Sequence, residues 1–268
     1  MKKLTLSLFC AGVISTASIA EDLCNAAYQA GNYTQSEQCY IKQLKKERSF
    51  NNLYRAGVSL YRQERYQEAL PYAIEAEKKA QSLDDYAAVY GLLGTIYRIL
   101  GNLDQTYVYY MKSLDIELKI GNMDYIATAY NNLGTYYFHK SQYQKALESF
   151  EQSLSYKKES EKGTAYGNLG DLYGKMGDVK KQEEMYLKAI TNYERFGNYS
   201  DLGSTKANLG AFYYNQSRYD EAKVVLNEAL VIAQKAGLKE TETSILNLLA
   251  EITLRNDIKK ALENKTKK

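Results

Sequence analysis

The sequence contains very few of the residues on which most enzyme and metal chemistry depends. Its 268 residues include 1 histidine, 1 proline, 3 cysteines and no tryptophan. Because His139 is the only histidine, a metal site made of several histidines is excluded, and a catalytic cysteine–histidine pair could form only at His139. The sequence also lacks a phosphate-binding glycine loop, a Gly-x-Ser-x-Gly turn and a Cys-x₂-Cys pair. We therefore expect no metal, no cofactor and no enzymatic activity.

Excess charge is absent as well. The 35 basic and 32 acidic side chains leave a formal net charge of +3, too small to indicate a nucleic-acid partner. Beyond the N-terminus, no apolar run approaches the length of about 18 residues that a membrane-spanning helix needs. The sequence thus predicts no nucleic-acid binding and no stable membrane span after the N-terminal segment is removed.

Residues 1–20 have the pattern of a secretory signal peptide. Two lysines follow Met1, an uncharged apolar stretch runs from Leu4 to Thr16, and small residues stand at Ser18 and Ala20. We expect cleavage after Ala20 and export, to the periplasm if the source is a bacterium. A single membrane anchor is the alternative, but the stretch is barely long enough to cross about 30 Å of hydrocarbon.

Export would place Cys24 and Cys39 in an oxidising compartment, where two cysteines usually pair. The turn at Gly31-Asn32 lies midway between them, so an antiparallel helical hairpin would bring both to a similar height. We expect a Cys24–Cys39 disulfide. The alternative is two reduced cysteines buried at helix contacts.

What the sequence has in abundance is tyrosine, 27 residues, and an internal repeat. A glycine recurs in the same frame five times. In the last three repeats it ends the triplet Asn-Leu-Gly. Around it, apolar residues at −4, −1 and +3 form one helical stripe, and those at +9, +12, +16 and +20 form a second. The five glycines are Gly57, Gly94, Gly134, Gly170 and Gly210.

Turn residues between the two stripes, such as Gly177-Asp178 and Ser217-Arg218, make each unit two antiparallel helices. We expect left-handed glycine caps where the second helices stop, at Gly121, Gly163, Gly197 and Gly237. The recurring glycine within each first helix predicts close packing by the small residue twelve positions later, for example Ala146.

This frame resembles the tetratricopeptide repeat over residues 22–262, and its period of 36–40 is similar to the extended repeats of kinesin light chain. The resemblance implies an all-α fold, a right-handed superhelix of antiparallel helix hairpins. We expect a signal peptide at 1–20, an irregular first hairpin at 21–50, five repeats at 51–240, and capping helices with a basic tail at 241–268. The closing hairpin is expected over residues 243–262.

Stacked hairpins of this kind place their first helices along a concave groove. Positions −2, +1 and +5 from the glycine point away from the packing stripe. Asparagines Asn132, Asn168 and Asn208 occupy three −2 positions and, with Asn131, form a ladder of amides able to pair with a peptide backbone. The matching asparagines of the extended repeats contact bound peptide. Alternatively, these asparagines cap or bridge neighbouring helices within the stack.

Other residues of the same frame complete the predicted groove. Two of them, Asp171 and Asn215, stand at +1 and +5. Arg55, Arg62 and Arg98 form a basic stretch that could attract an acidic segment or a terminal carboxylate of a partner. Alternatively, they are solvated arginines on an ordinary helix face. The remaining predicted groove residues are Arg55, Arg62, Arg98, Thr135, Phe138, His139, Lys175 and Tyr214.

The sequence therefore predicts an exported scaffold or adaptor without enzymatic activity, which binds a protein or peptide in its groove. One alternative is a sensor for short peptides or small ligands. Another is an envelope enzyme, such as a polysaccharide hydrolase, that uses scattered carboxylates. The oligomeric state and the identity of the partner are not encoded in any pattern that we recognise.

Overall fold

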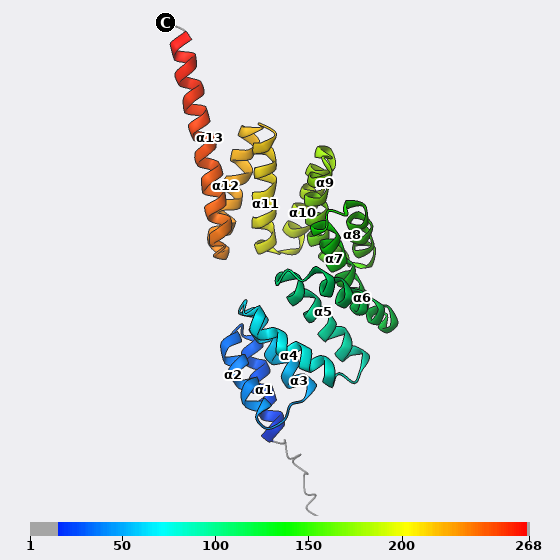
Figure 1. Cartoon of the computed structure of the whole chain (residues 1–268). Coiled ribbons are helices and arrows are strands. Elements are labelled where there is room, and N and C mark those ends of the chain that lie inside the picture. The colour runs from blue at the N-terminus through cyan, green and yellow to red at the C-terminus, as the bar shows by residue number, and fades with distance from the viewer. Residues whose placement is uncertain (1–15, 267–268) are drawn as a thin grey trace, which may run out of the picture. The chain divides into compact units, whose positions relative to one another are not determined.

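The computed structural model describes residues 16–266, which form thirteen α-helices and one 3-10 helix and contain no strand (Figure 1). The predicted all-α fold is confirmed. Most of the predicted signal peptide, residues 1–15, lies outside the described residues, and the first helix begins at Thr16, ahead of the predicted cleavage point. None of the described helices is long and apolar enough to cross a membrane.

The chain divides into two compact units, the first ending at Ile116 and the second beginning at Glu117. In unit 1 the helices pack mainly on their neighbours in chain order. Their bounds are α1 Thr16–Gln29, α2 Tyr33–Leu44, α3 Phe50–Arg62, α4 Tyr66–Lys79, α5 Leu83–Ile99 and α6 Leu103–Ile120, the last of which contains the boundary.

Unit 2 continues the pattern with three further hairpins and one closing helix (Figure 1). The tightest packing is within the hairpins, between α7 and α8, α9 and α10, and α11 and α12. Their bounds are α7 Met123–His139, α8 Tyr143–Tyr156, η1 Glu159–Glu161, α9 Gly163–Met176, α10 Val179–Phe196, α11 Tyr199–Asn215, α12 Tyr219–Ala236 and α13 Lys239–Thr266.

The recurring glycines pack against the second helix of their hairpin, but the residue twelve positions later is among the nearest neighbours only at Gly57, where the Ala69 carbonyl oxygen would lie 3.6 Å from an added Cβ. A Cβ atom added to Gly134 would lie 2.5 Å from the ring of Phe150, and one added to Gly170 would lie 2.6 Å from the ring of Tyr186. These rings are sixteen positions after the glycine, not twelve. Ala146, at twelve, is buried but is not among the atoms nearest to a Cβ at Gly134.

Three of the four predicted glycine caps have left-handed backbone, with φ of 77° at Gly121, 80° at Gly197 and 70° at Gly237. Gly163 is different, because it is the first residue of α9 and not the end of α8. Its N–H donates to Asn192 Oδ1 at 3.0 Å. The absence of a Cβ there leaves room for the ring of Tyr193.

Cys24 of α1 and Cys39 of α2 are joined by a disulfide, with their Cα atoms 5.3 Å apart. Cys24 is fully buried in the core of unit 1, against residues such as Leu53 and Leu60 of α3. The disulfide therefore links the two helices of the first hairpin on the side that packs on the next hairpin.

The expected closing hairpin over residues 243–262 is wrong. The segment forms one continuous helix, α13, which runs to Thr266 and includes most of the predicted basic tail. Ile245 and Ile252 are buried against α11 and α12, whereas Leu254 and Ile258 farther along are exposed. A turn is not formed because the segment contains no glycine or proline after Gly237 to interrupt the helix.

Candidate functional site

The described part of unit 2 contains a pocket of about 400 Å³. Residues near the ends of the first helices α7, α9 and α11 line it, together with residues of α10. The lining residues are Phe138 of α7, Asp171, Gly174 and Lys175 of α9, Gln182 and Tyr186 of α10, Phe212 and Asn215 of α11, and Gln216 at the end of α11.

Four of these lining residues were identified from the repeat frame. Asp171, Lys175 and Asn215 were expected to point away from the packing stripe and Phe138 was predicted as a groove residue, and all four line the same pocket. Their helices bring them together because α9 lies between α7 and α11 in the chain order of the stack. The other lining residues were not predicted from the sequence: Gly174, Gln182, Tyr186, Phe212 and Gln216.

Two of these residues, Gly174 of α9 and Gln182 of α10, compensate for each other in size. Gln182 stands where the other repeats carry Ala69, Thr106, Ala146 or Ala222. Its larger side chain fits because residue 174 is glycine: a Cβ there would lie 2.6 Å from Gln182 Nε2. A comparison of all five repeats at these two positions is the signal that would have found the pocket.

The polar groups of the pocket are partly paired with each other. The Tyr186 hydroxyl donates a hydrogen bond to Asp171 Oδ1. Although part of the Asp171 side chain is open to solvent, loss of hydration around the carboxyl group raises its pKa, while the hydrogen bond from Tyr186 and the charge of Lys175 oppose this shift. Desolvation, reinforced by the Asp171 charge, raises the pKa of Tyr186. The pocket thus contains a neutral phenol bound to a carboxyl group.

The predicted asparagine ladder is present in part as a bond between helices. Asn168 Nδ2 of α9 donates to Asn131 Oδ1 of α7 at 2.8 Å. This bond uses one of the donors of Asn168 and leaves the two amides with further hydrogen-bonding capacity. Asn132 is half-buried on α7, and Asn208 is exposed on α11. The asparagines therefore bridge helices in one place and remain accessible in another.

Three other predicted groove residues of unit 2 do not line the pocket: Thr135, His139 and Tyr214. Thr135 donates its hydroxyl to the carbonyl of Asn131 at 3.0 Å, within α7. His139 is exposed at the end of α7, with its ring edge-on to Phe138 at 5.7 Å between centroids. Tyr214 is held by α13, since its hydroxyl donates to Glu251 and Arg255 lies over its ring.

The predicted basic residues Arg55, Arg62 and Arg98 all belong to unit 1, whereas the pocket belongs to unit 2. Arg55 lies over the ring of Tyr28 with its Cζ 6.0 Å from the centroid. Arg62 Nε donates to the hydroxyl of the same tyrosine at 3.3 Å. Arg98 is half-buried on α5. Two of the three arginines therefore connect α3 to α1.

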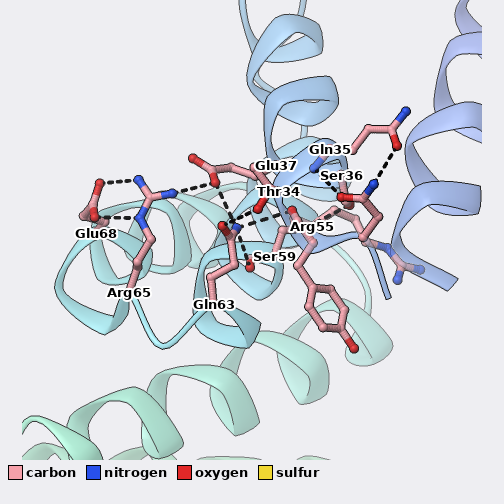
Figure 2. A network of polar contacts seen from close by, with 11 residues as sticks. Thr34, Gln35, Ser36, Glu37, Arg55, Ser59, Gln63, Arg65 and Glu68 are labelled. Carbon is pink, nitrogen blue, oxygen red and sulfur yellow. Dashed lines mark hydrogen bonds and ion pairs between the residues drawn. The ribbon is translucent and has the colours of Figure 1, made fainter. Parts of the chain in front are cut away.

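Unit 1 also contains a polar network that the sequence does not predict (Figure 2). The carboxylate of Glu37, nearly buried in α2, accepts hydrogen bonds from Gln63 Nε2 at 2.9 Å and from Arg65 at 2.6 Å. Arg65 also pairs with Glu68. Because Arg65 precedes α4, the network fixes α4 against α2, and we assign it to packing between hairpins.

Among the described residues, no group of three or more histidine, cysteine, aspartate or glutamate side chains is arranged to hold a metal ion. The polar side-chain groups that line the pocket are amides, one carboxyl group, one ammonium group and the hydroxyl of Tyr186. These groups recognise hydrogen-bonding ligands, and the aromatic walls recognise apolar surface.

Comparison with protein families decides the classification. Tetratricopeptide-repeat families match residues 22–82, 54–105, 85–159, 163–195 and 202–236. The chain belongs to the tetratricopeptide-repeat family. No curated protein matches this tetratricopeptide-repeat chain.

Solved structures share the fold at low sequence identity. BtubC (BKLC) from P. vanneervenii is 20% identical with a TM-score of 0.61, over 83% of this chain and 90% of that one. A putative kinesin light chain with nearly identical repeats from Podosopora anserina is 16% identical with a TM-score of 0.56, over 70% and 95%. A STAND protein with a tetratricopeptide repeat sensor from Pyrococcus horikoshii is 18% identical with a TM-score of 0.67, over 88% and 38%.

Proposed function

We propose that this tetratricopeptide-repeat protein is an exported scaffold without enzymatic activity, which binds a segment of another protein on the first-helix face of unit 2. The observation that carries the proposal is the pocket, which collects outward-facing residues of α7, α9 and α11 around a hollow of about 400 Å³. Its lining combines aromatic walls with amide and charged groups, as binding sites for peptides do.

Export is the second part of the proposal. It is supported by the signal-peptide pattern of residues 1–20 and by the disulfide between Cys24 and Cys39, a bond that persists mainly in oxidising compartments. Mass spectrometry of the protein purified from its native source under non-reducing conditions tests both: the N-terminus should be Glu21, and one peptide pair should be linked. An intact Met1 with two free thiols would contradict export.

Binding on the first-helix face is tested by site-specific photo-crosslinking in the native cell. A photoreactive residue is placed at Asn208 of α11, which is exposed on the proposed face, and at Asn227 of α12, which is exposed on a second helix. We expect one defined protein to be captured at position 208 and not at 227. Equal capture at both positions would show that the proposed face is not the binding surface.

The amide ladder is then tested with the captured partner in purified form. Replacing Asn132, Asn168 and Asn208 together by alanine should weaken binding about 100-fold, since each lost hydrogen bond contributes about 1 kcal/mol. Asn227→Ala is the matched control and should leave the dissociation constant unchanged. Undiminished affinity of the triple variant, with helix content retained by circular dichroism, would remove the asparagines from the site.

A sensor of short peptides is the second candidate, because a pocket of this volume is within the usual range for small ligands. A library of short peptides separates the two functions. A rise in melting temperature with a free peptide favours the sensor, whereas capture of a folded protein without response to short peptides favours the scaffold.

A further inference from the structure

The fourth repeat differs from its neighbours at the positions that surround the pocket. Four residues after the recurring glycine, three repeats carry an aromatic ring, and the second repeat carries Arg98. The fourth repeat carries Gly174. The three aromatic residues at this position are Tyr61, Phe138 and Tyr214.

Each of these three rings packs on a tyrosine at the start of the second helix of its own hairpin. The ring centroids are 5.5 Å apart for Tyr61 and Tyr66, 6.3 Å for Phe138 and Tyr143, and 5.6 Å for Tyr214 and Tyr219. In the fourth repeat both partners are missing, since Gly174 faces Val179 at the corresponding positions.

The pocket lies at this incomplete repeat. Gly174 is one of its lining residues, and three aromatic side chains also line it: Phe138 from the preceding repeat, Phe212 from the following one, and Tyr186 from α10 of the same repeat. A ring placed between them would find the edge-to-face and offset contacts that aromatic side chains prefer.

Charge does not favour an ionic occupant. The lining includes one carboxyl group, Asp171, and one ammonium group, Lys175, so the pocket has no net sign. The Asp171 carboxyl group already accepts the hydroxyl of Tyr186. The polar rim, with Asn215 and Gln216, is suited to the hydroxyl of a phenol or to the peptide groups on either side of a ring.

From this we infer that the pocket receives a tyrosine or phenylalanine side chain of the bound partner, which takes the place of the ring missing from the fourth repeat. The inference rests on the proposed function, because the ring belongs to the segment bound on the first-helix face. It adds a specificity: segments without an aromatic residue are discriminated against.

The probes are N-acetyl-tyrosinamide and N-acetyl-phenylalaninamide, with N-acetyl-alaninamide and N-acetyl-argininamide as comparisons. Binding to the full mature chain is followed by nuclear magnetic resonance at the amide of Gly174 and the side-chain amides of Gln182 and Asn215. We expect saturable shifts with the two aromatic probes, with dissociation constants on the order of 1 mM, as is usual for ligands of this size. Equal shifts with alaninamide or argininamide would overturn the inference.

The decisive variant restores the usual repeat. Gly174→Phe combined with Gln182→Ala reproduces the pair found in the third repeat, Phe138 and Ala146, and fills the pocket from within. Because it removes a glycine from a helix, it should melt at or above the temperature of the natural protein. We expect the aromatic probes to bind at least 10-fold more weakly. Undiminished binding in this folded variant would refute the pocket as the aromatic site.

Gly167→Ala is the control, since it also removes a glycine from α9 but lies outside the pocket lining, where an added Cβ would meet nothing within 4 Å, and it should retain the aromatic probes. The partner captured at position 208 separates this inference from the proposed function. If that partner binds the double variant as tightly as the natural protein, the aromatic pocket is wrong and the scaffold stands. If the aromatic probes bind specifically but no partner is captured, the pocket is supported and the scaffold is wrong.

Discussion

At the scale of single residues, the turns within the hairpins depend on one left-handed backbone position. The residue before each N-cap has a positive φ, and glycine occupies it at Gly31, Gly101 and Gly177. In the other three turns the residue is Glu64, Ser141 or Ser217, with φ of 60°, 56° and 59°. A side chain in this conformation is strained by contact of its Cβ with the following carbonyl group.

Ser141→Gly should therefore raise the free energy of unfolding by about 0.5 kcal/mol, because the relief of strain slightly exceeds the extra entropy that glycine loses on folding. Urea unfolding followed by circular dichroism measures the difference. The reciprocal change, Gly177→Ser, should lower stability by about 1 kcal/mol. A loss of stability in Ser141→Gly would mean that the turn does not carry this strain.

The residue scale also shows how far the sequence predicts the site. Helical periodicity is enough to place Asp171, Lys175 and Asn215 on one face, because that face follows from spacing alone. The pocket itself was not predicted, since it arises from a side chain that is missing at Gly174. Its depth depends on how Gln182 and the surrounding rings pack, and spacing contains no information about that packing.

At the scale of helices, an arginine before the second helix connects consecutive hairpins twice. Arg218 at the start of α12 binds Glu183 of α10 at 2.9 Å and also pairs with Glu221. Arg65, Glu37 and Glu68 repeat this arrangement in unit 1. In both cases the glutamate stands five residues after the N-cap of the earlier helix. In α4 and α8 the residue five positions after the N-cap is leucine, at Leu70 and Leu147. The second helix of the next hairpin then has no arginine at its N-cap.

This pairing predicts a pH-dependent contribution to stability. The hydrogen bond from Arg218 is the main cause that lowers the pKa of Glu183, and the hydrogen bond from Tyr213 adds to it. Desolvation opposes both. A carboxyl group with a lowered pKa in the folded state stabilises the protein above its ordinary pKa, and the stabilisation is lost as the pH falls through the folded value. Glu183→Gln should therefore cost about 1–2 kcal/mol at pH 7.

Urea unfolding of the natural protein and of Glu183→Gln at pH 7 and at about pH 3 tests this linkage, and the difference between them should shrink at the lower pH. Glu184→Gln is the matched control. Its carboxylate is adjacent in sequence but pairs with Lys188 on the surface, so the change should stay within about 0.5 kcal/mol. A deficit in Glu183→Gln that is the same at both pH values would assign the effect to packing.

The closing helix marks the limit of prediction for whole elements. Hairpins with turn residues between their stripes were placed correctly, because glycine, serine and asparagine stop helices for local reasons. The last segment was expected to turn back by analogy with the repeats before it. Nothing local supports that turn, and α13 continues as a single helix that contacts α11 and α12 as far as Arg255 and leaves Leu254 and Ile258 exposed.

At the scale of the whole molecule, stability is distributed along the chain. Each hairpin packs mainly on its neighbours in sequence, so a local change is felt mostly by the adjoining repeats. The chain also divides into two units at Ile116. A bond in the first hairpin should accordingly protect unit 1 and have little effect on unit 2.

The Cys24–Cys39 disulfide provides the test. It closes a loop with a sequence separation of 15, and breaking it should destabilise the first hairpin by about 3 kcal/mol in the chain-entropy treatment. Replacing both cysteines by serine should therefore speed amide exchange in α1 and α2 roughly 100-fold. Hydrogen-exchange mass spectrometry of the full chain measures this effect, with peptides from α9 to α12 as an internal reference whose exchange should not change. Faster exchange in both units would show that they unfold as one body, against the nearest-neighbour stability expected of a repeat protein.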